Sequence, residues 1–352
     1  MRLCNNAILA ALSILIPAST LSLPAQQAQP AEQSAPLTVD RDPARTPDDK
    51  NAAPASITKE NKGYILRTDV EEVSLNATVL EDNRLVPDLK KENFKVFEDG
   101  VQQALISFQH SDIPVSIALV VDNSGSMSRK RPSVNKSALD LIQASNRDDE
   151  AFVVNFSDEA FIDQEFTSDI NKLRDGLAHI ESRGGTALYD AVAASADKLA
   201  ADAKRPKQVI VLITDGEDNA SQLDLEQTIR RVQALSGPVI YSIGLLFGDE
   251  MSRAEVRHAR RALDMLSTET GGIAYFPKSI EQIDQIAAEV ARDIRNQYTL
   301  GYHSTKPTTE PGFRRVQVTA EAKDHGKLTV RTRTGYFPVP RGTKKATSPE
   351  QK

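Results

Sequence analysis

Short apolar runs alternate with amphipathic stretches through the middle of the chain. The candidate strands are 115–121, 151–156, 161–166, 209–213, 239–243 and 273–276. The stretches with helical spacing are 134–144, 170–180, 187–199, 225–233 and 255–268, followed by a closing helix with Ile280, Ile283, Ala287, Val290 and Ile294 on one face. This alternation predicts an α/β fold in which helices cover both faces of a mostly parallel sheet.

One short connection predicts the topology of that sheet. Only four residues, Ser157-Asp158-Glu159-Ala160, separate the second and third candidate strands. This connection is too short for a crossover between parallel strands. These two strands should form an antiparallel hairpin at one edge of a doubly wound, six-stranded sheet with the order 3-2-1-4-5-6. Strands one and four are then neighbours, and their carboxyl ends border the usual ligand crevice of such sheets.

The segments on either side of this domain show β-strand patterns. Apolar and polar positions alternate at 73–79, 316–320 and 328–331, and shorter strands are indicated at 94–96 and 104–108. Neither flank can hold a core alone, because two or three strands without a covering layer are marginal. We expect residues 63–111 and 298–340 to pair into one β-sandwich, with a domain of residues 112–297 inserted between them. The alternative is two separate appendages.

Both ends of the chain lie outside these patterns. Residues 1–25 combine Arg2, an apolar stretch at 7–16 and a run of small residues, which is the layout of a secretory signal peptide. An uncleaved anchor is the weaker interpretation, because Pro17 interrupts an apolar stretch that is already short for a membrane span. Residues 26–62 and 341–352 are polar, and we expect a disordered linker and a disordered tail.

Charge and cysteine usage narrow the classes of function. The formal net charge of -6 offers no electrostatic attraction to nucleic acid or to an anionic membrane. Cys4, the only cysteine, lies within the expected signal peptide, so disulfides and thiolate metal sites are excluded from the mature chain. No later segment is apolar enough to span a membrane. We therefore expect an exported protein, periplasmic or at the cell surface.

Five oxygen-bearing side chains stand where the predicted strands end or a helix begins. Asp122, Ser124 and Ser126 directly follow the run 115–121, Asp215 follows the run 209–213, and Thr186 follows Gly184-Gly185 at the start of a helix. These junctions should meet at the ligand crevice of the sheet. Oxygen ligands favour a hard divalent cation, here Mg²⁺ or Mn²⁺.

This set of residues resembles the metal-ion-dependent adhesion site of von Willebrand factor A domains, and the likeness covers residues 113–295. The flanking segments 89–100, 297–302 and 333–338 are similar to those of an exported bacterial group described as VWFA-related, seen especially in Acidobacteria. The resemblance implies that Ser124, Ser126 and Thr186 bind the cation, with Asp122 and Asp215 acting mostly through water. It also implies an open coordination position that an Asp or Glu of a partner protein fills, in a binding protein without catalysis.

Three other interpretations of these residues are weaker. Asp122, Ser124 and Ser126 could form only a helix cap and turn, but that would not require Thr186 or Asp215. Ser124 lacks the glycines of a nucleophile elbow, which argues against a hydrolase. No lysine and hydroxyl pair follows Gly184-Gly185, which argues against a phosphate loop. The alternative function is a structural scaffold of the cell envelope that works without metal. Glu217 and Asp218, which follow Asp215, are expected to be solvated loop charges rather than ligands.

Overall fold

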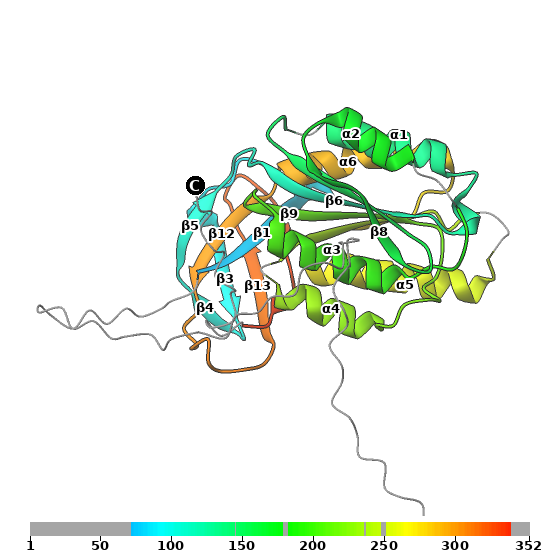
Figure 1. The fold of residues 1–352 in the computed structure, drawn as a ribbon. Helices are drawn as coiled ribbons and strands as arrows, with labels where there is room; N and C mark the ends of the chain where they lie inside the picture. Colours follow the sequence, from blue (N-terminus) through cyan, green and yellow to red (C-terminus); the bar gives the residue numbers. More distant parts are fainter. Residues whose placement is uncertain (1–71, 145, 179–181, 236, 248–250, 339–352) are drawn as a thin grey trace, which may run out of the picture. The chain divides into compact units, whose positions relative to one another are not determined.

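The inserted domain is built on one six-stranded sheet in the computed structural model, which describes residues 72–144, 146–178, 182–235, 237–247 and 251–338 (Figure 1). The expected signal peptide, linker and tail lie outside these residues. The strands are β6 (Val115–Asp122), β7 (Glu150–Phe156), β8 (Ala160–Thr167), β9 (Lys207–Thr214), β10 (Val239–Gly244) and β11 (Ala274–Tyr275). Their order is β11-β10-β9-β6-β7-β8. The predicted order is confirmed.

The pairing directions are also those the sequence predicts. β6 pairs in parallel with both β7 and β9, whereas β7 and β8 are antiparallel. Every residue of β6 and β10 is buried, which explains their unbroken apolar runs, because helices cover both faces of a parallel sheet. At the edge, β8 is only partly covered. β6 and β9 are therefore neighbours in the middle of the sheet.

Two layers of helices enclose this sheet. The helices are α1 (Arg131–Gln143), α2 (Ile170–Ala178), α3 (Leu188–Asp202), α4 (Leu225–Ala234), α5 (Arg253–Thr270) and α6 (Ile283–Arg295). Apolar side chains of α1, α2 and α6 pack with one face of the sheet, and those of α3, α4 and α5 pack with the other (Figure 1). α1 begins three residues before the predicted start, since Pro132 is well suited to a first helical turn.

The flanking strands form a second core with two sheets. One sheet has the order β14-β1-β12-β5 with β2 beside β1, and the other has the order β15-β13-β3-β4. The strands are β1 (Glu72–Glu81), β2 (Arg84–Leu85), β3 (Phe94–Glu98), β4 (Val101–Gln103), β5 (Leu105–Gln109), β12 (Tyr298–His303), β13 (Arg314–Ala320), β14 (Leu328–Arg331) and β15 (Gly335–Tyr336). β1 pairs with β12, and β3 pairs with β13. The predicted pairing of the two flanks is confirmed.

A buried carboxylate joins these early and late strands. Glu98, at the end of β3, accepts hydrogen bonds from the hydroxyls of Tyr302 (2.7 Å), Tyr336 (2.9 Å) and Ser304 (2.5 Å). The buried guanidinium of Arg314 lies 3.6 Å from the same carboxylate. Paired in this way, a charge can remain inside the sandwich.

The chain enters and leaves the inserted domain on adjacent strands. β5 precedes the domain and β12 follows it, and these strands pair with Thr299 opposite Gln109. The insertion therefore needs no long crossing connection. Among the described residues, no helix combines the length and apolarity needed to cross a bilayer.

Candidate metal centre

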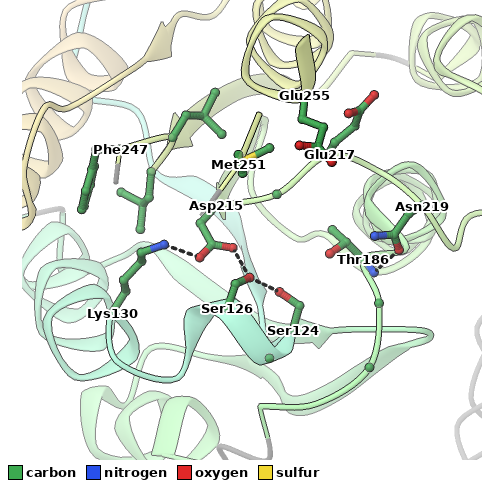
Figure 2. Close-up of a pocket in the computed structure, with 16 residues that line it drawn as sticks. Ser124, Ser126, Lys130, Thr186, Asp215, Glu217, Asn219, Phe247, Met251 and Glu255 are labelled. Carbon is green, nitrogen blue, oxygen red and sulfur yellow. Dashed lines mark hydrogen bonds and ion pairs between the residues drawn. The ribbon is translucent and has the colours of Figure 1, made fainter. Parts of the chain in front are cut away.

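The five predicted residues come from three loops at the carboxyl edge of the central sheet. Asp122 is the last residue of β6, Asp215 directly follows β9, and Thr186 lies two residues before α3. Because β6 and β9 are adjacent and parallel, their ends meet at one edge. Figure 2 shows Ser124, Ser126 and Asp215 next to one another, with Thr186 on the side away from Lys130.

Two serine hydroxyls and a carboxylate form a continuous chain of oxygens. The Ser124 and Ser126 Oγ atoms lie 3.2 Å apart, and the Ser126 hydroxyl donates to Asp215 Oδ1 at 2.8 Å. Both serines lie around a short 3₁₀ turn, Gly125–Met127, which the buried side chain of Met127 anchors in the core. The turn thus presents two neutral hydroxyls beside the negative carboxylate of Asp215, which comes from a different loop.

Asp122 lies beneath this chain and is fully buried. Its Oδ1 accepts the backbone N–H of Ser124 at 2.8 Å, and its Oδ2 accepts the hydroxyl of Thr214 at 2.5 Å. Burial raises the pKa of Asp122 to about 6, although these hydrogen bonds favour the ionised form. The carboxylate is thus held in one orientation at a cost in solvation.

A network of hydrogen bonds holds the backbone of Thr186, and the sequence interpretation did not include it. The Thr186 N–H donates to Asn219 Oδ1 at 2.8 Å, and the Asn219 N–H donates to the Thr186 carbonyl at 3.0 Å. The Gly185 N–H donates to Asp158 Oδ1 at 2.6 Å. A Cβ on Gly185 would lie 2.6 Å from Asn219 Oδ1 and 2.9 Å from Asp158 Oδ1, so a larger residue would push these two side chains away from their hydrogen bonds.

Two basic residues next to the site were also absent from the sequence interpretation. Lys130 Nζ lies 2.5 Å from Asp215 Oδ2. Arg131 is fully buried, and it donates to Asn155 Oδ1 at 2.8 Å. Burial lowers the pKa of Arg131 to about 10, and attraction to Asp122 opposes this shift. Both residues belong to a basic run, Arg129 to Arg131, that by composition alone is typical of a solvated surface.

The two acidic residues after Asp215 have different environments. Glu217 pairs at 3.2 Å with the exposed ring of His258, as expected for a charge at the rim. Asp218 is half-buried, and its Oδ1 accepts from the Ser221 hydroxyl at 2.5 Å and from the Tyr189 N–H at 3.3 Å. Asp218 is therefore not simply solvated, because it satisfies a backbone N–H in the first turn of α3.

Four of the five predicted residues, Ser124, Ser126, Thr186 and Asp215, line an open cavity of about 280 Å³, and Asp122 is not among its lining residues. Hydroxyl and carboxylate oxygens form one side, and Leu245, Leu246, Phe247 and Met251 form an apolar wall (Figure 2). The described residues contain no cluster of three or more His, Cys, Asp or Glu side chains suited to a metal. Hydroxyls with two carboxylates suit a hard cation such as Mg²⁺. The donor set therefore fits the predicted ion.

The Ser124 hydroxyl has no activating base among the contacts described for it. Its hydrogen-bond partner is the hydroxyl of Ser126. His258 is 72% exposed and pairs with Glu217, and His325 pairs with Glu81 in the sandwich. A serine nucleophile requires a base within hydrogen-bond reach. This geometry gives no support to a hydrolase.

Comparisons with known proteins identify the central part of the chain. Residues 117–217 match the family model described as von Willebrand factor type A domain. The inter-alpha-trypsin inhibitor heavy chain H4 of Homo sapiens is 26% identical over 238 residues, which cover 61% of this chain and 24% of that protein. The Bos taurus protein of the same name is 25% identical over 240 residues, covering 62% and 25%. The chain spans about a quarter of the length of these curated relatives.

Three solved structures are similar at low sequence identity. A von Willebrand factor type A protein from Catenulispora acidiphila is 12% identical with a TM-score of 0.45, covering 77% of this chain and 75% of that one. The domain of the type V pili tip protein Mfa5 from Porphyromonas gingivalis is 13% identical with a TM-score of 0.42, covering 52% and 97%. Proximal thread matrix protein 1 from the mussel byssus, with a zinc-occupied MIDAS motif, is 18% identical with a TM-score of 0.45, covering 57% and 50%.

Proposed function

The chain contains a von Willebrand factor type A domain, a protein-interaction module, and from this premise we propose that it binds a partner protein through a divalent metal. Mg²⁺ or Mn²⁺ is held by Ser124, Ser126 and Thr186, with Asp122 and Asp215 acting mostly through water. The partner presents an Asp or Glu side chain to the ion. Residues 112–297 form the binding domain, and they carry out no catalysis.

The closeness of neutral and charged oxygens at the mouth of an open cavity carries this proposal. Ser126 Oγ lies 3.2 Å from Ser124 Oγ and 2.8 Å from Asp215 Oδ1, above the buried carboxylate of Asp122. Asp215 already has the ammonium of Lys130 beside it. The hydrogen bonds described for the buried Asp122, in contrast, come from the Ser124 N–H and the Thr214 hydroxyl, so a cation here would offset buried negative charge. The ion, when bound, supplies that charge and a coordination position for a carboxylate oxygen.

The side chains of this protein divide the remaining work. The hydroxyls of Ser124, Ser126 and Thr186 are neutral. They would therefore leave most of the positive charge of the bound ion available to a partner in the cavity. Asn219 and Asp158 fix the backbone on either side of Thr186. We also propose that the protein acts outside the cytoplasm, because residues 1–25 have the layout of a secretory signal.

A peptide array tests this function directly. The full chain should bind a subset of peptides that contain one Asp or Glu when Mg²⁺ is present. It should lose them in chelator and when the acidic residue is replaced by its amide, because a neutral amide is a poor substitute for an anionic ligand. Equal binding with and without chelator would favour the alternative of a metal-independent scaffold.

The affinity for Mg²⁺ should fall in acid. Burial raises the pKa of Asp122 to about 6, so below that pH a proton competes with the ion, and each further unit should weaken binding about tenfold. Calorimetric titrations at about pH 7.5 and about pH 5 measure this effect. An unchanged affinity would contradict it. Without bound metal, the same pKa shift predicts that the free energy of unfolding falls as pH rises from about 4 to about 6. In this range the folded chain holds the Asp122 proton more tightly than the unfolded chain does.

A further inference from the structure

An ammonium group occupies one side of the proposed metal site. Lys130 Nζ lies 2.5 Å from Asp215 Oδ2, while Asp215 Oδ1 accepts the hydroxyl of Ser126 (Figure 2). The Asp215 side chain is fully buried, and the Lys130 side chain is only 14% exposed. The Phe247 ring, whose centroid is 5.7 Å from Nζ, adds a cation–π attraction. Both oxygens of Asp215 are therefore engaged within the protein.

This contact neutralises one of the two carboxylates that would attract a divalent cation. An ion held by Ser126, with Asp215 acting on it through water, would still stand a few ångströms from the ammonium, where two positive charges repel each other. The ion pair and the bound ion thus make opposing demands on the same carboxylate. For the ion to bind, the ammonium has to leave Asp215.

We propose that Lys130 is a tethered cation that competes with the divalent metal for Asp215, and so sets the metal concentration at which the site fills. This inference rests on the proposed function, because it concerns the same site. The consequence is regulatory. Lys130 raises the concentration of divalent ions that is needed to fill the site, so partner binding depends on the concentration of these ions around the protein. A metal ion that must first displace Lys130 from Asp215 binds with an affinity reduced by the free energy of that displacement.

Variants of Lys130 separate this role from a structural ion pair. Lys130→Met and Lys130→Gln should bind Mg²⁺ at least about tenfold more tightly than the parent chain, because a charged hydrogen bond no longer competes. Lys130→Arg keeps the charge and should stay within about threefold of the parent. Lys136→Gln is the matched control, since Lys136 lies on α1, which begins directly after Lys130, and pairs with Asp140 and Asp284 at the surface. Calorimetric titration of the full chain gives the affinities.

The outcomes distinguish this inference from the proposed function. If the parent chain and the neutral variants bind Mg²⁺ equally, or the variants bind it more weakly, competition by Lys130 is refuted and the metal site stands. If neither the parent nor any Lys130 variant binds Mg²⁺ or Mn²⁺, the proposed function fails and the inference fails with it. Should both neutral variants fail to fold, acylation of the Lys130 amine in the parent chain decides. The amine should become more reactive as Mg²⁺ is added, and constant reactivity would overturn the proposal.

Discussion

The Asp122→Asn variant is expected to lose Mg²⁺ affinity by about tenfold to a hundredfold. Asparagine keeps the size of the side chain, and its single oxygen can still accept the Ser124 N–H, while its amide nitrogen takes the place of the oxygen that accepts the Thr214 hydroxyl. It removes the buried negative charge beneath the serine hydroxyls, which is the part of Asp122 that favours a cation. Calorimetric titration of Mg²⁺ into the variant and the parent chain measures the loss.

Asp149→Asn is the matched control for this experiment. Asp149 is a buried carboxylate that accepts the N–H of Val115 at 2.7 Å, so it lies at the opposite end of the same strand. Its neutral variant should bind Mg²⁺ like the parent chain. Equal affinity in Asp122→Asn and Asp149→Asn would remove Asp122 from the metal site.

The Glu98→Ala variant should lower the free energy of unfolding of the sandwich by about 3–5 kcal/mol. The substitution leaves the hydroxyls of Tyr302 and Tyr336 without their acceptor and the guanidinium of Arg314 without its nearest carboxylate. Unpaired polar groups in a core are far more costly than the pair they came from. Denaturant unfolding, followed by tyrosine fluorescence, measures the change.

An exposed glutamate in the same sandwich provides the comparison. Glu321 pairs with Lys95 at 3.5 Å and is 79% exposed, so Glu321→Ala should change stability by less than about 0.5 kcal/mol. If Glu98→Ala is as mild as Glu321→Ala, the carboxylate that joins β3 to β12 and β15 contributes little. The first and last strands would then depend on apolar packing alone.

Most of the architecture was predictable because it follows from the spacing of apolar residues and from the lengths of the connecting segments. Buried central strands are marked by apolar runs, and the expected ranges lie within one or two residues of the observed bounds at each end for all six strands of the domain. The four-residue link at 157–160 allowed only a hairpin, which fixed the order of the sheet. The very short strands β2 and β4 were not predicted, because two or three residues carry too little periodicity. Strand register also depends on partners that a single segment does not reveal.

The site was less predictable than the fold. Asp122, Ser124, Ser126 and Asp215 could be named because each stands next to a recognisable strand. Lys130, Asp158 and Asn219 could not, since polar residues in loops look the same whether they face solvent or a neighbouring loop. Lys130 meets Asp215 across 85 positions of sequence, and no local pattern encodes that pairing. The spacing of a motif thus identifies candidate ligands without the groups that regulate or position them.

The pairing of β1 with β12 also constrains the order in which the protein can fold. Asn76 and Thr299 are 223 positions apart, yet their side chains lie 3.3 Å apart. Contacts between such distant segments form slowly, because a long loop has to close first. The inserted domain, with its more local contacts, can assemble while β1 and β3 still have unsatisfied backbone groups. Until the last strands emerge, the amino-terminal strands are open templates for association with other chains, so protection by a chaperone would be most valuable during this interval.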